Sequence, residues 1–479
     1  MKLLKMRKII VQVLLFLIIP GAYAQHASGD NTTEAEFDAI LKSPDRTTRD
    51  IPTFPTFISL KKFAPIPLSQ DPYQTCVAWS STYAARTISY AIKRNITNPD
   101  SIKKYAFSPE YVYYKVKQPT DADCSAGGNI LSAMQVMTSN GAMLKKEGFD
   151  NCITTIPETT ESQKAGPYKI KTFMMVNKKK GAVEKNDINT IKTKLIEKNP
   201  VVISLNIDDA FQTVPKSGIW IPEAGFASNN YHAMCIIGYN DKMAGGAFEV
   251  MNSWGNKWGN NGFFWLSYKQ LLDYGSYAVE MMDFEVGKTE LNGNIEFVKW
   301  EDPKEVPLKK VTRIKIDTSN TAVKTGTKPN YSLYKLTQAL KSGEKFKIKF
   351  RTNAPCFIYI FGKDTRDSID LLFPVNTSFS AAINSPNATF YLPSDSTNAT
   401  LDTNVGKETF CILYSKDSID YEGLKAYIKE KNIFRAVKDK LGARLLDINK
   451  ILFQDGSINF KAPADEKSVL CFFVEMIHN

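Results

Sequence analysis

Three side chains in this sequence are of the types that carry out nucleophilic catalysis: a cysteine, a histidine and an asparagine. Cys76 stands where the polar, irregular stretch that begins at Gln70 gives way to helix-like apolar spacing that continues to about Lys93. A cysteine in the first turn of a helix lies beside unsatisfied backbone N–H groups and the positive end of the helix dipole, and both stabilise a thiolate. The alternative is that Cys76 is a small buried hydrophobe of an amphipathic helix.

An imidazole is the usual partner of a nucleophilic cysteine, and the chain holds three histidines. His26 and His478 lie near the two ends of the chain, where we expect mobile residues. His232 opens a strand-like apolar run that ends at Gly238. His232 is therefore the candidate base.

A side-chain amide is the third candidate. Asn252 begins the stretch Asn-Ser-Trp-Gly, in which Trp254 and the glycines predict a tightly packed turn around a polar side chain. A group that holds the imidazole in one tautomer usually completes a site of this kind. Asn252 is the residue we expect in that role.

With Cys76, His232 and Asn252 in this order and spacing, the chain resembles the papain family of cysteine peptidases over about residues 50–285. The resemblance implies that Cys76 is the nucleophile, His232 the general base and Asn252 the residue that orients the imidazole. It also implies a peptide or protein as the substrate, with no cofactor and no metal.

The same resemblance extends to residues around the proposed nucleophile and cleft. Gln70 precedes Cys76 by six positions, as the family's oxyanion-hole glutamine does, and Gly127-Gly128 resembles the glycines of the substrate cleft. Trp254 is implied as the shield of the contact between imidazole and amide. We therefore expect Gly127, Gly128 and Trp254 to line the substrate site.

Three positions depart from the family pattern. Val77 replaces the usual tryptophan after the nucleophile, and Gln74 stands where a glycine is common, which puts the packing of the oxyanion side in question. Tyr73 occupies the position of a cysteine that usually bridges to the region near Cys124. The family's disulfide at that place is therefore absent.

The order of the elements predicts an α+β fold. Helical signals come first, including a helix capped by Ser108 and one that opens at Gly127. From Asp187 onward one further helix leads into strand-like runs at 201–207, 220–221, 234–237, 248–252 and 263–266. This agrees with a papain-like fold of two lobes, one helical and one resembling a β-barrel, whose cleft brings Cys76 and His232 together.

The chain divides by composition into segments of different character. We predict a signal peptide at 1–24, an N-terminal tether at 25–50, a papain-like peptidase domain at 51–285, a linker at 286–324 and a β-rich accessory domain at 325–479. The accessory domain resembles an uncharacterised β-sandwich-like module of secreted bacterial enzymes. Its strand signals and size predict that it folds by itself and carries no catalytic residue.

The first 24 residues have the features of a secretory signal peptide. Four basic residues precede the apolar run Ile9–Ile19, and Ala22-Tyr23-Ala24 stands before Gln25 as a cleavage site. The apolar run is too short to anchor the chain in a bilayer. The protein is therefore predicted to be periplasmic or extracellular, without stable membrane insertion. Residues 25–50 are too short for the long pro-segment that papain relatives commonly carry.

Seven cysteines raise the question of pairing. Cys124 and Cys152 are a plausible bridge that would add roughly 3 kcal/mol of stability. Cys235 lies in an apolar strand and is expected to be an unreactive hydrophobe. The remaining three, Cys356, Cys411 and Cys471, belong to one domain, so at least one of them stays free or pairs elsewhere.

Charge and motifs argue against other classes of function. The formal net charge falls from +11 to +7 once the leader is removed, and no long basic block interleaved with aromatic residues suggests nucleic-acid binding. Motifs for serine hydrolases, zinc peptidases and nucleotide binding are missing from the sequence. A transglutaminase-like site normally has an aspartate where this chain has Asn252. The alternative that stays open is a papain-like scaffold that has lost catalysis and binds peptide or glycan; side-chain preference and oligomeric state are not predicted.

Overall fold

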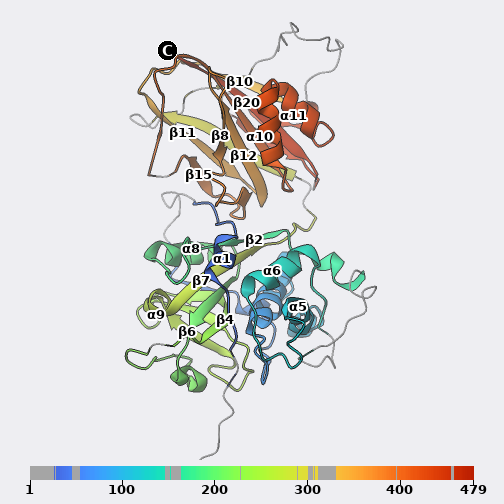
Figure 1. Ribbon diagram of the computed structural model, residues 1–479, viewed down its shortest axis with the longest axis vertical. Coiled ribbons are helices and arrows are strands. Elements are labelled where there is room, and N and C mark those ends of the chain that lie inside the picture. Colours follow the sequence, from blue (N-terminus) through green and yellow to red (C-terminus); the bar gives the residue numbers. More distant parts are fainter. Residues whose placement is uncertain are drawn as a thin grey trace, which may run out of the picture.

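The computed structural model describes residues 26, 28–45, 54–145, 152, 163–226, 228–287, 290–299, 306, 308–310, 331–394, 396–454, 458–465 and 467–479. The predicted signal peptide lies outside the described residues. Within the described ranges, no helix is long and apolar enough to cross a membrane. Figure 1 shows two parts stacked along the long axis, a mixed helical and sheet part and a β-rich part that ends at the C-terminus.

The helix that begins at Cys76 is the centre of the helical lobe. It runs to Lys93 as α2 (Cys76–Ala78), a π-helical stretch (Trp79–Arg86) and α3 (Thr87–Lys93). All residues from 76 to 91 are buried, so this helix is covered on every side and not on one face as its apolar spacing predicts. Buried polar side chains such as Thr82 and Arg86 make the sequence look more amphipathic than its environment is.

The other helices of this lobe begin at polar caps. They are α4 (Pro99–Lys104), α5 (Pro109–Val116) and α6 (Ile130–Ser139). The side chain of Ser108 accepts a hydrogen bond from the N–H of Tyr111, so the predicted cap is confirmed, and Asn129 caps α6 in the same way. Short 3-10 helices lie at Lys61–Phe63, Gly166–Tyr168, Asp209–Thr213 and Ile448–Lys450.

A seven-stranded antiparallel sheet forms the second lobe. Its strands run in the order β2-β7-β3-β4-β5-β6, with β1 paired to β4, and this path does not close into a barrel. The strands are β1 (Phe57–Ser59), β2 (Thr172–Met175), β3 (Val201–Asn206), β4 (Tyr231–Asn240), β5 (Ala247–Met251), β6 (Phe263–Ser267) and β7 (Gly275–Met282), with helices α8 (Lys185–Ile196) and α9 (Tyr268–Tyr274) beside them. The α+β prediction is confirmed. The strand expected at 220–221 is not formed, because Trp220 instead buries its ring against Phe211 and Tyr274.

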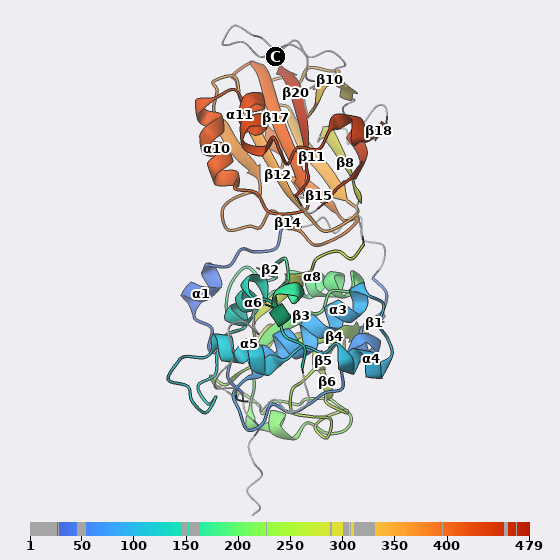
Figure 2. The ribbon, with the colours of Figure 1, turned by 90° about the vertical axis from the view of Figure 1, so that its right-hand side faces the viewer.

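The β-rich part is a sandwich of two sheets, as predicted. One sheet has the order β13-β12-β17-β20-β10-β9 and the other β15-β11-β8-β19-β18, with a buried core between them. Helices α10 (Tyr421–Glu430) and α11 (Ile433–Leu441) cover the outer face of the first sheet (Figure 2). The strands are β8 (Glu290–Lys299), β9 (Leu308–Lys310), β10 (Ser332–Leu336), β11 (Lys345–Thr352), β12 (Cys356–Lys363), β13 (Ile369–Phe373), β14 (Ala382–Ile383), β15 (Thr389–Leu392), β16 (Ala399–Thr400), β17 (Gly406–Ser415), β18 (Leu452–Gln454), β19 (Ile458–Pro463) and β20 (Val469–His478).

The linker predicted at 286–324 is wrong at its start, because residues Glu290–Lys299 form strand β8. It pairs with β11 on one side and β19 on the other, so the sandwich begins at about residue 290. Leu291, Ile295 and Phe297 are buried while the residues between them are partly exposed, which is the alternation of a half-buried strand. The sandwich, described from residue 290 onward, is called the C-terminal module below.

The N-terminal segment, residues 28–45, was expected to be a polar tether. In the structure it packs on the part formed by the helical lobe and the seven-stranded sheet, and it contains α1 (Glu34–Asp38), which Thr33 and Glu36 start with a capping box. Phe37 on this helix is completely buried and packs edge-on against Tyr277. Figures 1 and 2 place α1 at the level where the two parts of the molecule meet.

Candidate functional site

Cys76 and His232 come from opposite lobes and meet where α2 packs against β4. Cys76 is the first residue of α2, and His232 is the second residue of β4. The backbone N–H of Ala233 points at the Cys76 sulfur, so the thiol lies next to the residue that follows His232. Both side chains are completely buried. The structure thus brings the predicted nucleophile and base together across the boundary of the two lobes.

The amide of Asn252 fixes the imidazole of His232. The Nε2 atom of His232 lies 2.7 Å from Oδ1 of Asn252, and the same oxygen accepts a hydrogen bond from the N–H of Ser253 at 2.8 Å. Because that oxygen is an acceptor, Nε2 carries the proton of the neutral ring. Nδ1 is then the basic nitrogen, and it has no hydrogen-bond partner among the described residues.

Trp254 covers this pair. Its ring stacks on that of His232 with centroids 4.7 Å apart, and on that of His26 at the same distance. His26 also contacts the carboxylate of Asp71 through Nδ1 at 2.7 Å. His26 is therefore packed at the edge of the site and not mobile as expected.

Gln70 ties the loop before the nucleophile to the turn that holds Asn252. Its Nε2 donates to the backbone carbonyl of Tyr73 at 2.9 Å, and its Oε1 accepts from the hydroxyl of Ser253 at 2.6 Å. Its backbone N–H donates to the carbonyl of Ser253 at 2.8 Å.

The N-terminal segment passes beside the thiol, since the backbone N–H of Gly29 points at the Cys76 sulfur. The N–H groups of Gly29 and Asp30 donate to the carbonyl of Tyr231 at 3.3 and 3.0 Å. Gly128 donates its N–H to the carbonyl of Gly29 at 2.9 Å and accepts from the N–H of Asn31 at 2.8 Å. These bonds form a parallel bridge between the N-terminal segment and the predicted cleft glycine.

Glycine is required on both sides of this contact. Gly127 has φ +75°, and a Cβ atom there would lie 2.6 Å from the carbonyl oxygen of Gly29. A Cβ atom on Gly29 would lie 2.8 Å from the carbonyl oxygen of Gln74. Any larger residue at either place would push the N-terminal segment out of the cleft.

Asp30 places a carboxyl group inside the cleft. The hydroxyl of Tyr277 lies 2.9 Å from each of its oxygens, and the hydroxyl of Thr32 donates to one of them at 2.9 Å. Burial raises the pKa of Asp30 above its ordinary value. The hydrogen bonds from the hydroxyl groups that face it lower the pKa, but they do not cancel the effect of burial. The carboxyl group therefore gives up its proton less readily here than in water.

Burial also sets the charge state of the two proposed catalytic groups. It raises the pKa of Cys76 to about 12, with a further contribution from the charge of Asp30, and it lowers the pKa of His232 to about 4. With the N-terminal segment in place, Cys76 is a neutral thiol and His232 a neutral imidazole. The thiolate expected at the helix N-terminus is not favoured in this state, because loss of water outweighs the helix dipole.

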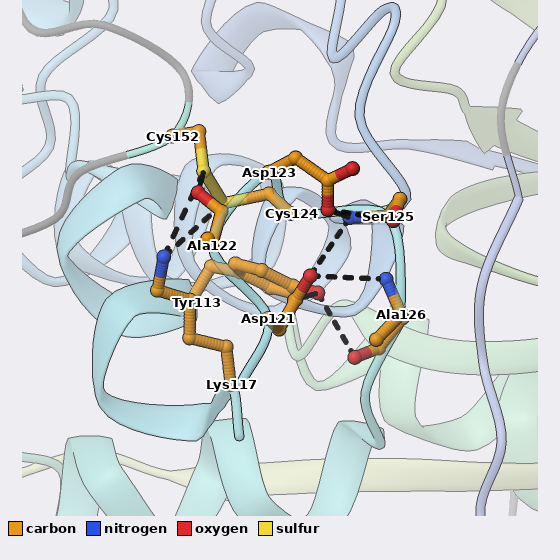
Figure 3. The surroundings of a disulfide bond; sticks show 10 residues. Tyr113, Lys117, Asp121, Ala122, Asp123, Cys124, Ser125, Ala126 and Cys152 are labelled. Carbon is orange, nitrogen blue, oxygen red and sulfur yellow. Dashed lines mark hydrogen bonds between the residues drawn. A yellow bond between two sulfur atoms is a disulfide. The ribbon is translucent and has the colours of Figure 1, made fainter. Parts of the chain in front are cut away.

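A disulfide fixes the loop that carries the cleft glycines. Cys124 and Cys152 are bonded, as predicted, with Cα atoms 5.8 Å apart (Figure 3). The carbonyl of Cys124 accepts from the N–H of Gln74 at 2.9 Å, which links this loop to the residues just before the nucleophile. Asp121 accepts from the N–H groups of Ser125 and Ala126 and holds the turn that follows. The other five cysteines are free and buried, so none of the three in the C-terminal module is paired.

Several site residues were missed from the sequence: Gly29 and Asp30 of the N-terminal segment, and Tyr231 and Tyr277 of the sheet. Nothing in their local pattern marks them as functional. The capping box at Thr33 and the apolar residue that follows it were signals of an ordered segment. No group of metal-binding side chains occurs within the described residues.

Comparisons with known proteins find matches to both parts of the chain. Residues 75–282 match the family model described as papain family cysteine protease, and residues 339–418 match a domain of unknown function, DUF4384. The chain is 28% identical over 119 residues to cathepsin B-like cysteine proteinase 2 of Haemonchus contortus, and 37% identical over 89 residues to an uncharacterized peptidase C1-like protein of Acanthamoeba polyphaga mimivirus.

These matches cover 24% and 18% of this chain, and the chain spans only 34% and 28% of the two curated relatives. Among solved structures, xylellain, a cysteine protease from Xylella fastidiosa, aligns at 17% identity with a TM-score of 0.43. That alignment covers 54% of this chain and 96% of xylellain.

Proposed function

Since the chain carries a papain-family cysteine peptidase domain, we propose that it hydrolyses peptide bonds through Cys76, His232 and Asn252. The observation that carries the proposal is the hydrogen bond between Nε2 of His232 and Asn252. This bond leaves Nδ1 of His232 as the basic nitrogen. The next residue of the same strand, Ala233, contacts the Cys76 sulfur through its backbone N–H. A peptide or protein is the substrate, and the predicted leader exports the enzyme to the periplasm or beyond the cell.

The first chemical step is formation of the nucleophile. When the N-terminal segment leaves the cleft, water reaches both groups, and the thiol proton passes to Nδ1 of His232. Asn252 keeps its hydrogen bond to Nε2 and so holds the imidazolium in place. Trp254 covers this bond and limits competition from water.

The thiolate then attacks the carbonyl carbon of the substrate. The backbone N–H of Cys76 and the side-chain amide of Gln70 stabilise the oxyanion. His232 donates its proton to the leaving amine as the C–N bond breaks, which leaves an acyl thioester on Cys76. His232 next takes a proton from water, and the hydroxide releases the acid and the free thiol.

A catalytically inactive scaffold that only binds peptide is the second candidate. The observation in its favour is that the cleft holds a backbone segment while Cys76 is buried and neutral. The two candidates differ in whether the thiol reacts.

The test combines peptide cleavage with covalent labelling. Wild-type protein should cleave members of a mixed peptide library and take up a thiol-directed epoxide at Cys76. Cys76→Ala should lose both, whereas Cys235→Ala, which removes another buried free cysteine, should keep both. A folded wild-type protein that cleaves no peptide and takes no label, even after the N-terminal segment has been removed by proteolysis, would establish the scaffold instead.

A further inference from the structure

The N-terminal segment leaves the cleft and reaches the C-terminal module at Lys42. The N–H of Lys42 donates to the carbonyl of Ser378 at 2.8 Å, and its carbonyl accepts from the N–H of Ser380 at 2.9 Å. On its other side the N–H of Ser43 donates to the carbonyl of Met175 at 2.8 Å. The segment is thus inserted between β2, the edge strand of the peptidase sheet, and a loop of the C-terminal module.

A buried carboxylate joins the three parts at the same place. Glu280 on β7 is completely buried and pairs with Lys194 of α8 at 2.8 Å. It accepts from the hydroxyl of Ser43 at 2.6 Å and from the side-chain amide of Asn384, in the C-terminal module, at 2.9 Å. A buried charge needs all of its partners, so loss of any one part weakens the position of the other two.

Apolar packing supports these polar bonds. Met174 of β2 and Met282 of β7 are completely buried, and they belong to the same cluster as Phe357, Ala381 and other residues of the C-terminal module. Ser385 of the module adds a hydrogen bond to Glu197 beyond α8 at 2.8 Å. The module therefore rests on the peptidase part through a packed face.

We infer that the C-terminal module acts as a clasp that holds the N-terminal segment across the peptidase cleft and so keeps Cys76 inaccessible. This inference assigns a function to the module. It rests on the proposed peptidase function only in that an open cleft would then allow peptide cleavage. Between the clasp at Lys42 and the cleft at Asp30, the segment is held by the buried ring of Phe37 and by a hydrogen bond from Asn129 to Glu36. Loss of the hydrogen bonds between Lys42 and the C-terminal module frees this end of the segment and favours opening of the cleft.

The test measures opening of the cleft in the full chain by hydrogen exchange at the amides of Asn31 and Gly128, and by the rate of epoxide labelling at Cys76. Ser380→Pro removes the N–H that binds Lys42, and Asn384→Ala removes the amide that binds Glu280. The loss of one such bond should speed both exchange and labelling about 5- to 30-fold. Lys171→Ala is the matched control, because it removes a bond of 2.6 Å to the carbonyl of Lys416 in the same module, a bond that involves neither the N-terminal segment nor Glu280, and it should leave both rates within about twofold.

If Ser380→Pro fails to fold, Asn384→Ala decides the question alone. Unchanged exchange in folded Asn384→Ala protein, or equal acceleration in Lys171→Ala, overturns the clasp. The exchange readout does not depend on catalysis. Faster exchange without any peptide cleavage therefore supports the clasp and contradicts the peptidase, and peptide cleavage with unchanged exchange does the reverse.

Discussion

The hydroxyl of Tyr277 lies 2.9 Å from both carboxyl oxygens of Asp30, inside the cleft and close to the Cys76 thiol. This contact makes an acidic residue of the N-terminal segment part of the closed site. Because the carboxyl group is buried, its charge state is coupled to whether the segment is in or out of the cleft.

The first prediction is that Asp30 weakens closure as the pH rises. Its pKa is raised in the closed state, so its contribution to closure is complete below the ordinary pKa of aspartate and is lost as the pH rises through the raised value. Asp30→Asn keeps the shape and stays neutral. At neutral pH the variant should therefore show slower labelling of Cys76 than the wild type, while at pH 4 the two should label alike. Labelling rates measured across pH 4–8 check this, and a ratio that does not change with pH would contradict it.

The second prediction is that acid opens the cleft through His232. Its pKa is lowered to about 4 in the closed state from 6.5, so closure is favoured above pH 6.5 and loses that contribution as the pH falls toward 4. The groups that act on the pKa of the ring are Asn252, Asp71 and His26, and the rings of Trp254 and Phe211 pack against it. In the Asp30→Asn background, which lacks the opposing effect of the carboxyl group, exchange at the amide of Asn31 should accelerate over this interval. Protection that is constant from pH 7 to 4 would show that His232 stays neutral in both states.

The candidate catalytic residues could be proposed from the sequence because the residues beside them in the chain form recognisable local patterns. Cys76 stands at the start of a helical pattern. Asn252 begins a stretch whose glycines and tryptophan predict a tightly packed turn. These local patterns determine which lobe each residue belongs to. The hydrogen bond from His232 to Asn252 then follows from the pairing of β4 with β5.

The N-terminal segment could not be predicted because its structure comes from distant partners. Residues 28–31 are small and polar, and they become ordered through Gly128 and Tyr231, far along the chain. His478 was misjudged for the same reason, since it pairs in β20 and its side chain is 1% exposed. Strand β8 was missed because it has few apolar residues, Leu291, Ile295, Phe297 and Val298, and it is completed only by pairing with β11 and β19.

The third prediction concerns Gln70 as a donor to the oxyanion. Gln70→Ala should lower kcat roughly 10- to 1000-fold with little change in KM, because the lost N–H acts mainly in the transition state. Ser253→Ala is the matched control: it removes the bond to Oε1 of Gln70 and leaves the N–H groups, so its effect on kcat should be much smaller. Steady-state kinetics with a short fluorogenic peptide, with the melting temperature of each variant, separate the two. A change confined to KM would place Gln70 in substrate binding.

The last prediction is that removal of the C-terminal module destabilises the peptidase part and speeds its turnover of short peptides. The sequence leaves open whether the module docks the enzyme on a target or packs on the peptidase part. The buried contacts of Met174, Met282 and Glu280 favour packing. A chain that ends at Gly287 exposes both methionines. Full burial of a methionine side chain contributes about 1.5–3 kcal/mol to the free energy of unfolding, so the shorter chain should melt at a lower temperature than the full chain.

The shorter chain also lacks the loop that binds Lys42, so a larger fraction of its folded molecules should have an open cleft. Turnover of short peptides per folded molecule should then rise, and it should fall again when the separately produced module, residues 288–479, is added back. Equal turnover by both chains, together with an unchanged melting temperature, would show that the module neither supports nor restrains the peptidase. A selective loss of activity on whole proteins, with short-peptide turnover unchanged, would instead identify the module as a docking domain.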